Sequence, residues 1–359
     1  MLYYWFFSTQ NASTEDITLR AGIAALIAFI MSIVFGAELI KRLRRRGVAE
    51  DVTKKDSEEL KKLHKSKAGV PTMGGITIIA AVLFAVLICA DLSNGYILLV
   101  LLTTVWLGVL GFVDDYIKLT RKHAHGLQDT SKFICQLILG LVLGLILYLY
   151  FPGVNHSANI IIPILKDNSI FLGLFFVLFV AIFVVGMSNS VNLTDGLDGL
   201  AIGCTIIVTL ALVILCYISG RVDFSSYLQM PYVPGSGELC VFCASLVGAS
   251  MGFIWYNGFP AQMFMGDTGS LAIGGMIAIV AVVIKQEILL LFMGGVFVME
   301  ALSVIIQVLV FKITKKRVFR CAPIHHHFQF KGWPETRIVL RMWIVTALLS
   351  VSGLISMKF

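Results

Sequence analysis

The stretch YILLVLLTTVWLGVLGFVDDYIK, residues 96–118, joins a long apolar run to two adjacent aspartates, Asp114 and Asp115. The apolar run is about as long as the ~20 residues that an α-helix needs to cross the hydrocarbon core of a bilayer. Like charges side by side repel each other, so this pair either marks the solvated end of a membrane helix or holds something positive. The choice depends on which side of the membrane the pair faces and on which other groups face that side.

The rest of the chain is equally apolar. Hydrophobic residues make up 58% of the 359 residues and charged residues 14%, whereas soluble domains are about 45–50% apolar and about 25% charged. We therefore expect an all-α polytopic integral membrane protein that forms one domain, residues 1–359, with about ten transmembrane helices. Apolar runs of suitable length place these spans at roughly 19–40, 72–91, 96–117, 132–151, 169–188, 199–219, 238–256, 269–285, 288–311 and 338–357.

Lys and Arg are distributed unevenly between the segments that join these spans. If the N-terminus is outside, 23 of the 28 basic residues fall in the inner segments, which are 41–67, 118–132, 189–198, 257–268 and 312–341. Basic residues favour the cytoplasmic side of a membrane. The sequence therefore predicts that both termini are periplasmic and that these five segments are cytoplasmic. Because orientation accounts for the net charge of +7, we expect no nucleic-acid partner.

Five polar segments from distant parts of the chain meet on this inner side. They are KAGVPTMGG (67–75), Asp114-Asp115, NLTDGLDG (192–199), the segment 257–270 and PIHHH (323–327). The outer segments contain few comparable groups. This convergence predicts a single cytoplasmic active site rather than a set of unrelated loops.

The carboxylates on the inner side are Asp114, Asp115, Asp195, Asp198 and Asp267. Such oxygen ligands suit Mg²⁺, which takes one or two carboxylates and completes its coordination with water and substrate phosphate. Together with Lys67, three histidines and glycine-rich backbone, they predict a Mg²⁺-dependent phosphoryl-transfer site. Asp198 precedes an expected span and could instead cap that helix.

Three other features allow further interpretations. The consecutive residues His325–His327 cannot easily direct all their rings at one metal, so contacts with phosphate or sugar are favoured over a zinc site. Cys240 and Cys243 form a CxxC inside an apolar helix, which favours small buried residues over a metal site.

Glu300 lies inside an expected span, where it is either a hydrogen-bonded structural group or functional, for example the coupling carboxylate of a transporter. Transporter sites favour the membrane midplane, whereas most acidic motifs here lie at the cytoplasmic edge.

The chain closely resembles the bacterial phospho-N-acetylmuramoyl-pentapeptide-transferase family in five segments: PTMGG (71–75), GFVDDY (111–116), NLTDGLDGLA (192–201), FPAQMFMGDTGSLAIGG (259–275) and APIHHHFQFKGWPE (322–335). The resemblance runs from about residue 67 to the C-terminus. The aspartate motifs are shared across the wider superfamily of polyprenyl-phosphate N-acetylhexosamine-1-phosphate transferases. The HHH segment followed by GWPE is the more specific part.

The resemblance implies that undecaprenyl phosphate attacks the β-phosphate of UDP-N-acetylmuramoyl-pentapeptide, giving lipid I and UMP for peptidoglycan synthesis. The reaction would take place on the cytoplasmic face of the bacterial inner membrane, among membrane lipids. A homodimer is implied by the resemblance alone. The nearest alternative is a sister transferase that moves N-acetylglucosamine-1-phosphate onto the same lipid. Only the sugar-recognition region, which includes 322–335, separates the two reactions.

The resemblance also implies roles for individual residues. Mg²⁺ would bind Asp267, and Asp114 would be the candidate base toward the lipid phosphate. The implied catalytic residues are Lys67, Asp114, Asp115, Asp267, His325 and His326. The implied substrate-binding residues are Thr72, Asn192, Asp195, Gly196, Leu197, Asp198, Asn257, Phe264, Ser270, Gln307 and His327, with Asp198 and Phe264 at the uracil. Because a phosphate monoester has its second pKa near 6, the need for a base is modest, and Asp114 could instead position the nucleophile.

Overall fold

The computed structural model describes residues 15–45, 67, 69–120, 126–150, 158–161 and 169–358, so most of the basic segment 41–67 lies outside the described residues. Within the described ranges nine helices are long and apolar enough to cross a membrane, and the protein is a polytopic membrane protein as predicted. They are α2 (Glu15–Arg45), α5 (Gly95–Thr120), α6 (Asp129–Tyr150), α7 (Phe175–Thr194), α8 (Leu200–Ser219), α10 (Glu238–Asn257), α11 (Gly266–Val283), α13 (Gly295–Thr314) and α15 (Glu335–Ser356).

The tenth expected span, 72–91, is the shorter helix α4 (Gly75–Cys89). Its 15 residues rise only about 22 Å, less than the ~30 Å of a typical hydrocarbon core. The backbone N–H groups of Gly74 and Gly75 donate to the carbonyls of Phe264 and Met265, each at 2.8 Å. The start of α4 is therefore joined to the segment that leads into α11.

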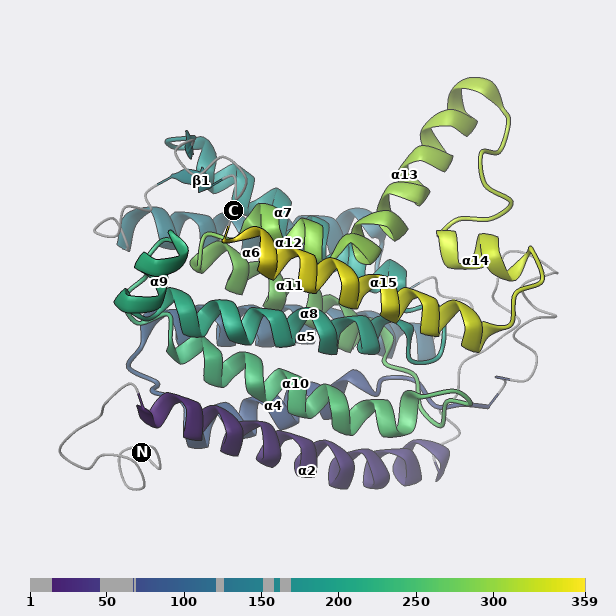
Figure 1. Ribbon diagram of the computed structural model, residues 1–359. Coiled ribbons are helices and arrows are strands. Elements are labelled where there is room, and N and C mark those ends of the chain that lie inside the picture. Colours follow the sequence, from purple (N-terminus) through teal and green to yellow (C-terminus); the bar gives the residue numbers. More distant parts are fainter. Residues whose placement is uncertain are drawn as a thin grey trace.

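The expected span 288–311 is divided at Gly294 into α12 (Glu287–Met293) and α13. Glycine weakens a helix interior because it has more backbone freedom than other residues, and a bend at Gly294-Gly295 agrees with this property. Figure 1 shows α13 leaving the bundle obliquely, after which the chain turns back toward the bundle and forms the short helix α14 (Ile324–Gln329).

Two elements interrupt the expected pattern of spans. Strands β1 (Asn159–Ile161) and β2 (Ser169–Phe171) form an antiparallel hairpin in which Ile160 lies opposite Ile170. The expected span 169–188 consequently begins later, as α7. The short helix α9 (Val222–Leu228) follows α8. Both the hairpin and α9 lie at the end of the bundle where the C-terminus lies, opposite to α14 (Figure 1).

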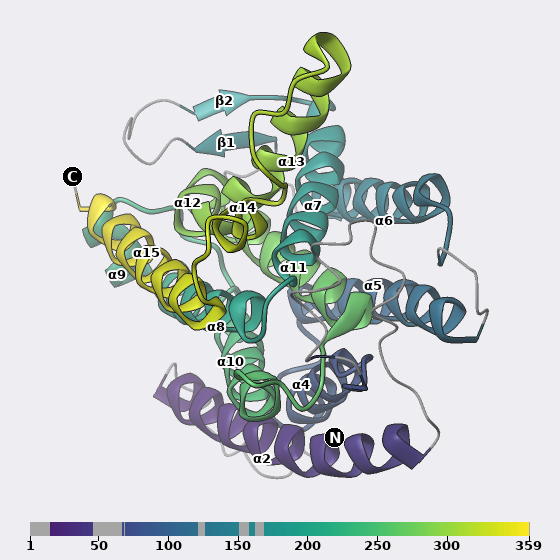
Figure 2. The same cartoon turned by 90° about the vertical axis from the view of Figure 1, so that its right-hand side faces the viewer.

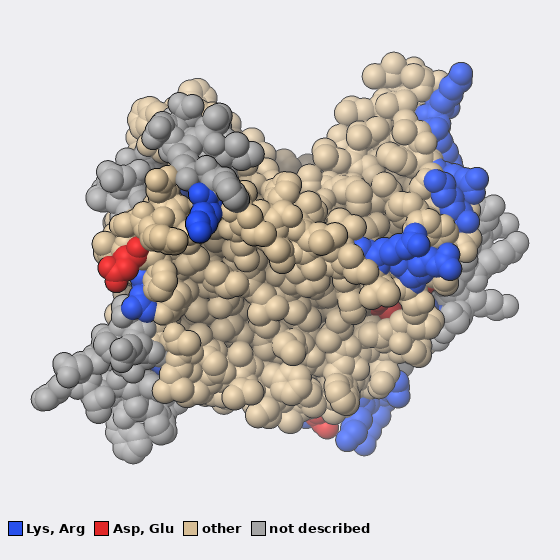
Figure 3. Space-filling model, in the orientation of Figure 1, with Lys and Arg blue, Asp and Glu red and all other residues tan. Residues whose placement is uncertain are grey.

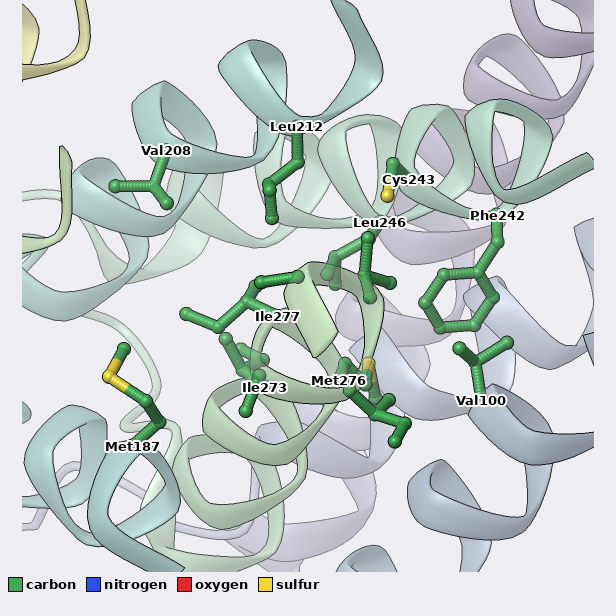
Figure 4. Packing of buried hydrophobic residues seen from close by; sticks show 14 of the residues in the cluster. Val100, Met187, Val208, Leu212, Phe242, Cys243, Leu246, Ile273, Met276 and Ile277 are labelled. Carbon is green, nitrogen blue, oxygen red and sulfur yellow. The ribbon is translucent and has the colours of Figure 1, made fainter. Parts of the chain in front are cut away.

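Helix α11 forms the centre of the bundle and packs against α4, α5, α7 and α8 (Figure 2). All its side chains from Thr268 to Val283 are buried, as expected of a helix that is apolar all round. Figure 4 shows Ile273 and Ile277 of α11 among side chains of the neighbouring helices, including Met187 and Leu212. Cys240 and Cys243 are buried in α10, in agreement with their expected role as small core residues.

Glycines bring three helices close together at the start of α11. A Cβ atom on Gly111 of α5 would lie 2.2 Å from the carbonyl oxygen of Asp267, and one on Gly75 of α4 would lie 2.1 Å from the backbone nitrogen of Gly269. Any larger residue would force the helices apart. The two glycines therefore fix α4 and α5 against the first turn of α11, where Asp267 lies.

The outer surface of the bundle is a broad apolar belt, with Leu26 64% exposed and Leu348 63% exposed. Most of the visible Lys and Arg residues gather at the end of the bundle where α14 lies (Figure 3). An apolar surface bounded by basic residues is the pattern of a helix bundle in a bilayer.

Candidate active site

Three carboxylates meet at the end of the bundle near α14. One carboxylate oxygen from each of Asp114, Asp115 and Asp267 lies within 4.8 Å of the others. Helix α5 carries the adjacent pair, and the first turn of α11 carries the third residue. We call these three residues the acidic cluster. Neighbouring residues of a helix point about 100° apart, and Asp114 and Asp115 accordingly have different partners.

Asp115 organises the start of α11. Its Oδ1 accepts a hydrogen bond from the backbone N–H of Asp267 at 3.1 Å, and its Oδ2 accepts from the backbone N–H and the hydroxyl of Thr268 at 2.9 and 2.7 Å. A carboxylate is favoured at a helix N-terminus, where N–H groups lack intrahelical partners. Gly266 has a φ of +74°, which suits glycine, and a Cβ there would lie 2.6 Å from Asp115 Oδ2.

Asp114 holds the chain that follows α5. Its Oδ1 accepts a hydrogen bond from the backbone N–H of Leu127 at 2.7 Å. Its Oδ2 forms ion pairs with Lys118 at 2.6 Å and with Lys132 at 3.5 Å. Asp114 is only 2% exposed, so solvent screens these pairs weakly.

Asp267 is surrounded by three donors. Lys118 and Lys132 reach its Oδ2 at 2.9 and 2.6 Å, and the Asn192 side-chain amide donates to its Oδ1 at 2.7 Å. Neither lysine is among the residues that the sequence singled out. The sequence alone could have indicated Lys118, because it lies four residues after Asp114 and therefore on the same face of the helix. Lys132 belongs to the next helix and only folding brings it here.

The acidic cluster fits a divalent cation. Its donors are all hard carboxylate oxygens, which Mg²⁺ prefers, and Mg²⁺ takes only one or two of them directly. Both oxygens of Asp115 are engaged by α11, whereas Oδ2 of Asp114 and Oδ2 of Asp267 face ammonium groups. Asp267 and Asp114 would therefore hold the ion, and Asp115 would position Asp267.

A second group of charges surrounds Lys67. Its ammonium group lies 2.6 Å from Asp198 Oδ1 and 2.6 Å from Glu335 Oε1, and Glu335 Oε1 also accepts the backbone N–H of Asp198 at 2.7 Å. We call Lys67, Asp198 and Glu335 the lysine cluster. Asp198 is not a helix cap, because Gly199 occupies the N-cap position of α8. The GWPE motif thus supplies a carboxylate, Glu335, which was not among the expected site residues.

Asn257 and Phe264 connect the loop before α11 to its neighbours. The Asn257 side chain accepts the N–H of Gly199 at 3.1 Å and donates to the carbonyl of Met263 at 3.0 Å. Phe264 exchanges backbone hydrogen bonds with Pro71 and Gly74, and its ring centroid lies 5.9 Å from Lys67 Nζ.

Four other expected residues differ in their surroundings. Thr72 is half-buried beside Gly266. The Ser270 hydroxyl accepts from Asn192 at 2.8 Å and donates to the carbonyl of Gly266 at 2.9 Å. Leu197 is buried in the apolar core. The Gln307 side-chain oxygen accepts the N–H groups of Val318 and Phe319, at 3.1 and 2.9 Å, and so holds the chain after α13.

The three histidines have three separate partners. His325 Nδ1 lies 3.0 Å from Glu300 Oε2, and His326 Nδ1 lies 2.8 Å from Gln329 Oε1. His327 Nδ1 accepts the backbone N–H of Arg320 at 3.1 Å. Partial burial, followed by the charges of Lys331 and Arg320, lowers the pKa of His327. The three Nδ1 atoms are therefore held by three different groups.

The segment 192–199 joins these groups into one site. Asn192, near the end of α7, bonds to Asp267 of the acidic cluster, and Asp198 bonds to Lys67 of the lysine cluster. Between them, a Cβ on Gly196 would lie 2.2 Å from His325 Nε2, so only glycine allows this approach. Asp195 lies half-buried in the same turn. One short segment therefore contacts the acidic, lysine and histidine groups.

A comparison with known protein families matches residues 97–285 to the model described as glycosyl transferase family 4. The match covers slightly more than half of the 359 residues. It contains the acidic cluster and the segment 192–199, but it ends before Glu300 and the histidines.

Proposed function

The chain belongs to glycosyl transferase family 4, the superfamily of polyprenyl-phosphate sugar-1-phosphate transferases, and on this premise we propose a specific reaction for it. The protein transfers phospho-N-acetylmuramoyl-pentapeptide from UDP-N-acetylmuramoyl-pentapeptide to undecaprenyl phosphate. The products are lipid I and UMP. Membership of a transferase family also argues against the transporter interpretation of Glu300.

The contacts of the segment 192–199 carry this proposal. Phosphoryl transfer between two anionic substrates needs a cation-binding group, cationic contacts to phosphate and a surface for the sugar. The segment reaches the acidic cluster through Asn192, Lys67 through Asp198 and His325 through Gly196. The choice of a muramoyl-pentapeptide donor rests on the resemblance of 322–335, which contains His325 and Glu335.

In the proposed reaction a lipid-phosphate oxygen attacks the β-phosphorus of the nucleotide sugar. A new P–O bond forms, the bridging bond to the α-phosphate breaks, and UMP leaves with that bridging oxygen. A phosphate monoester has its second pKa near 6, so at pH 7 the nucleophile is mostly a dianion. The step then requires no proton transfer, and Asp114 positions the groups around the attacking phosphate rather than acting as an obligatory base.

Repulsion between the two substrates is the main barrier that the site must lower. Mg²⁺ bound by Asp267 and Asp114 would neutralise phosphate charge and polarise the phosphoryl oxygens. Lys118 and Lys132, which lie within 2.9 Å of Asp267 Oδ2, can turn toward phosphate when a cation occupies the carboxylates. Lys67, fixed by Asp198 and Glu335, supplies a further positive charge beside the ring of Phe264.

The site faces the cytoplasm of a bacterial inner membrane in this proposal. The basic residues gather at the end of the bundle that carries α14 (Figure 3), and such residues favour the cytoplasmic side. Both termini would then be periplasmic. The homodimer implied by the resemblance remains a prediction.

The test uses the purified full chain in detergent with Mg²⁺ and a polyprenyl phosphate. UDP-N-acetylmuramoyl-pentapeptide and UDP-N-acetylglucosamine are supplied in separate reactions, and UMP release is measured in each. We expect UMP release from the first donor only. Release from the second donor only would replace the proposed specificity with that of the sister transferase, and release from neither would contradict the proposed function.

A further inference from the structure

Glu300 and His325 form a buried pair beside the proposed active site. Glu300 lies on α13 and is 0% exposed, and His325 lies on α14 and is 1% exposed. Two nitrogens of His325 converge on Glu300 Oε2, the ring Nδ1 at 3.0 Å and the backbone N–H at 3.4 Å. Because the backbone N–H is a donor, Oε2 is placed as an acceptor, and this arrangement assigns the ring proton to Nδ1.

The other ring nitrogen of His325 faces the segment 192–199. Nε2 is buried and makes no hydrogen bond within the described residues, and it lies where a Cβ on Gly196 would come within 2.2 Å. A buried polar atom without a partner costs about 1–3 kcal/mol. Such an atom, held at the segment that joins the acidic and lysine clusters, is well placed for a ligand.

Glu300 itself cannot reach a ligand through the same path, because His325 stands between its Oε2 and the segment 192–199. A carboxylate that accepts from one ring nitrogen of a histidine fixes the tautomer and the orientation of the ring. With the ring proton on Nδ1, Nε2 keeps its lone pair and can accept a hydrogen bond from an O–H or N–H group.

We propose that Glu300 is a positioning residue that holds His325 with Nδ1 protonated, so that Nε2 accepts a hydrogen bond from an O–H or N–H group of the nucleotide-sugar donor in the transition state. This inference rests on the proposed function. It differs from the two earlier interpretations of Glu300, because the carboxylate is neither the coupling group of a transporter nor a hydrogen-bonded group with a structural role alone.

The decisive comparison is between Glu300→Leu and Glu300→Gln. Leucine fills the space but accepts no hydrogen bond, whereas the glutamine oxygen still accepts from Nδ1 without the negative charge. For UMP release we expect Glu300→Leu to lower kcat about 100-fold with little change in KM, and Glu300→Gln to lower it about 10-fold. Glu287→Gln, on the neighbouring helix α12, is the matched control, and we expect it to leave kcat unchanged.

A double-mutant cycle separates positioning from a structural role. If Glu300 acts through His325, then Glu300→Leu lowers kcat less than twofold when His325→Ala is already present. An equal loss in both backgrounds would overturn the proposal. Should Glu300→Leu fail to fold, Glu300→Gln carries the test, and an unchanged kcat in that variant contradicts the proposal.

A spectroscopic measurement tests the pair independently of catalysis. With ¹⁵N-labelled histidine, the ring nitrogens of His325 are assigned by their loss in His325→Ala. We expect a protonated Nδ1 in the wild type and in Glu300→Gln, and a gain of the Nε2-protonated tautomer in Glu300→Leu. An unchanged tautomer in Glu300→Leu would overturn the positioning role. An absence of UMP release from the wild type would instead refute the proposed function while leaving this measurement interpretable.

Discussion

Two groups of buried charges lie at opposite ends of the bundle, since α10 begins at one group with Glu238 and ends near the other with Asn257. At the first end, the Arg20 guanidinium donates to both carboxylate oxygens of Glu238 at 2.9 and 2.5 Å. The backbone N–H of Asp91 also donates to Glu238, at 3.0 Å. One cation and one anion thus balance each other, and their shared partners tie α2, α4 and α10 together.

At the second end, like charges are crowded instead of balanced. The acidic cluster brings three carboxylates together, and two lysines contact more than one of them. A bidentate pair such as Arg20–Glu238 is well suited to hold helices in register. Three neighbouring carboxylates that share two lysines are poorly suited to holding helices in register. A divalent cation would stabilise such a group of carboxylates.

The largest effect is expected at the crowded end. Asp267→Asn keeps the size of the side chain but removes the charge that would hold Mg²⁺. We predict that UMP release falls at least about 1000-fold, while the thermal unfolding midpoint falls only slightly, because repulsion within the acidic cluster decreases but Lys118 and Lys132 lose one counter-charge. Both quantities are measured on the same detergent-purified sample. Substantial residual turnover would contradict the role given to Asp267.

The next effect is expected at the end of the bundle that contains the Arg20–Glu238 pair, where we expect a loss of stability without a loss of activity. Arg20→Leu leaves the mostly buried carboxylate of Glu238 without its counter-charge, and breaking a buried pair in this way costs about 3 kcal/mol of stability. We predict a lower unfolding midpoint but unchanged UMP release per folded molecule at low temperature. If Arg20→Leu lowered UMP release without lowering the unfolding midpoint, the Arg20–Glu238 pair would not have the structural role given to it here.

A third prediction concerns the buried residues Glu287 and Lys285, also remote from the acidic cluster. Burial raises the pKa of Glu287 to about 7, and Lys285 partly opposes this shift. The folded protein therefore keeps the Glu287 proton as the pH rises from about 4.5 to 7, whereas the unfolded chain loses it, and the folded state is progressively destabilised.

Glu287→Gln should remove this pH dependence. We predict that the variant matches the wild type near pH 4.5 and exceeds it at pH 8 by an amount on the order of 2 kcal/mol. Unfolding midpoints across this pH range provide the measurement. A constant difference between the two proteins at all pH values would contradict the assignment.

The smallest effect tests the lysines that share the acidic cluster. Lys132 is more buried than Lys118, with side-chain exposures of 15% and 41%. A charge with less solvent around it interacts more strongly with phosphate. We predict that Lys132→Met lowers kcat/KM about 10-fold and that Lys118→Met lowers it less. The reverse order, measured in parallel assays, would show that exposure does not decide which lysine contacts substrate.

Much of the fold could be predicted because membrane spans are read from the length of apolar runs. The nine long helices agree with the expected pattern. The shortness of α4 and the β1–β2 hairpin were not predicted. The start of α4 is joined to a distant segment by the backbone bond between Gly74 and Phe264, and an apolar run does not reveal such a contact.

The site was predicted less completely than the fold. The carboxylates were found because acidic residues at a bilayer edge are conspicuous in a sequence. Lys132, Glu335 and the pairing of Glu300 with His325 were missed because each joins residues from separate elements. The hydrogen bonds of Gln307 hold the chain after α13, and its contact with the substrate stays a prediction.

The central claim is that the crowded carboxylates hold a divalent cation, whereas the balanced pair holds the fold. Mn²⁺ can replace Mg²⁺ at such oxygen sites, and its binding is measured by electron paramagnetic resonance without substrates. We predict one Mn²⁺ per chain in the wild type and in Glu238→Gln, and binding at least about 100-fold weaker in Asp267→Asn. Equal Mn²⁺ affinity in Asp267→Asn and the wild type would contradict the claim.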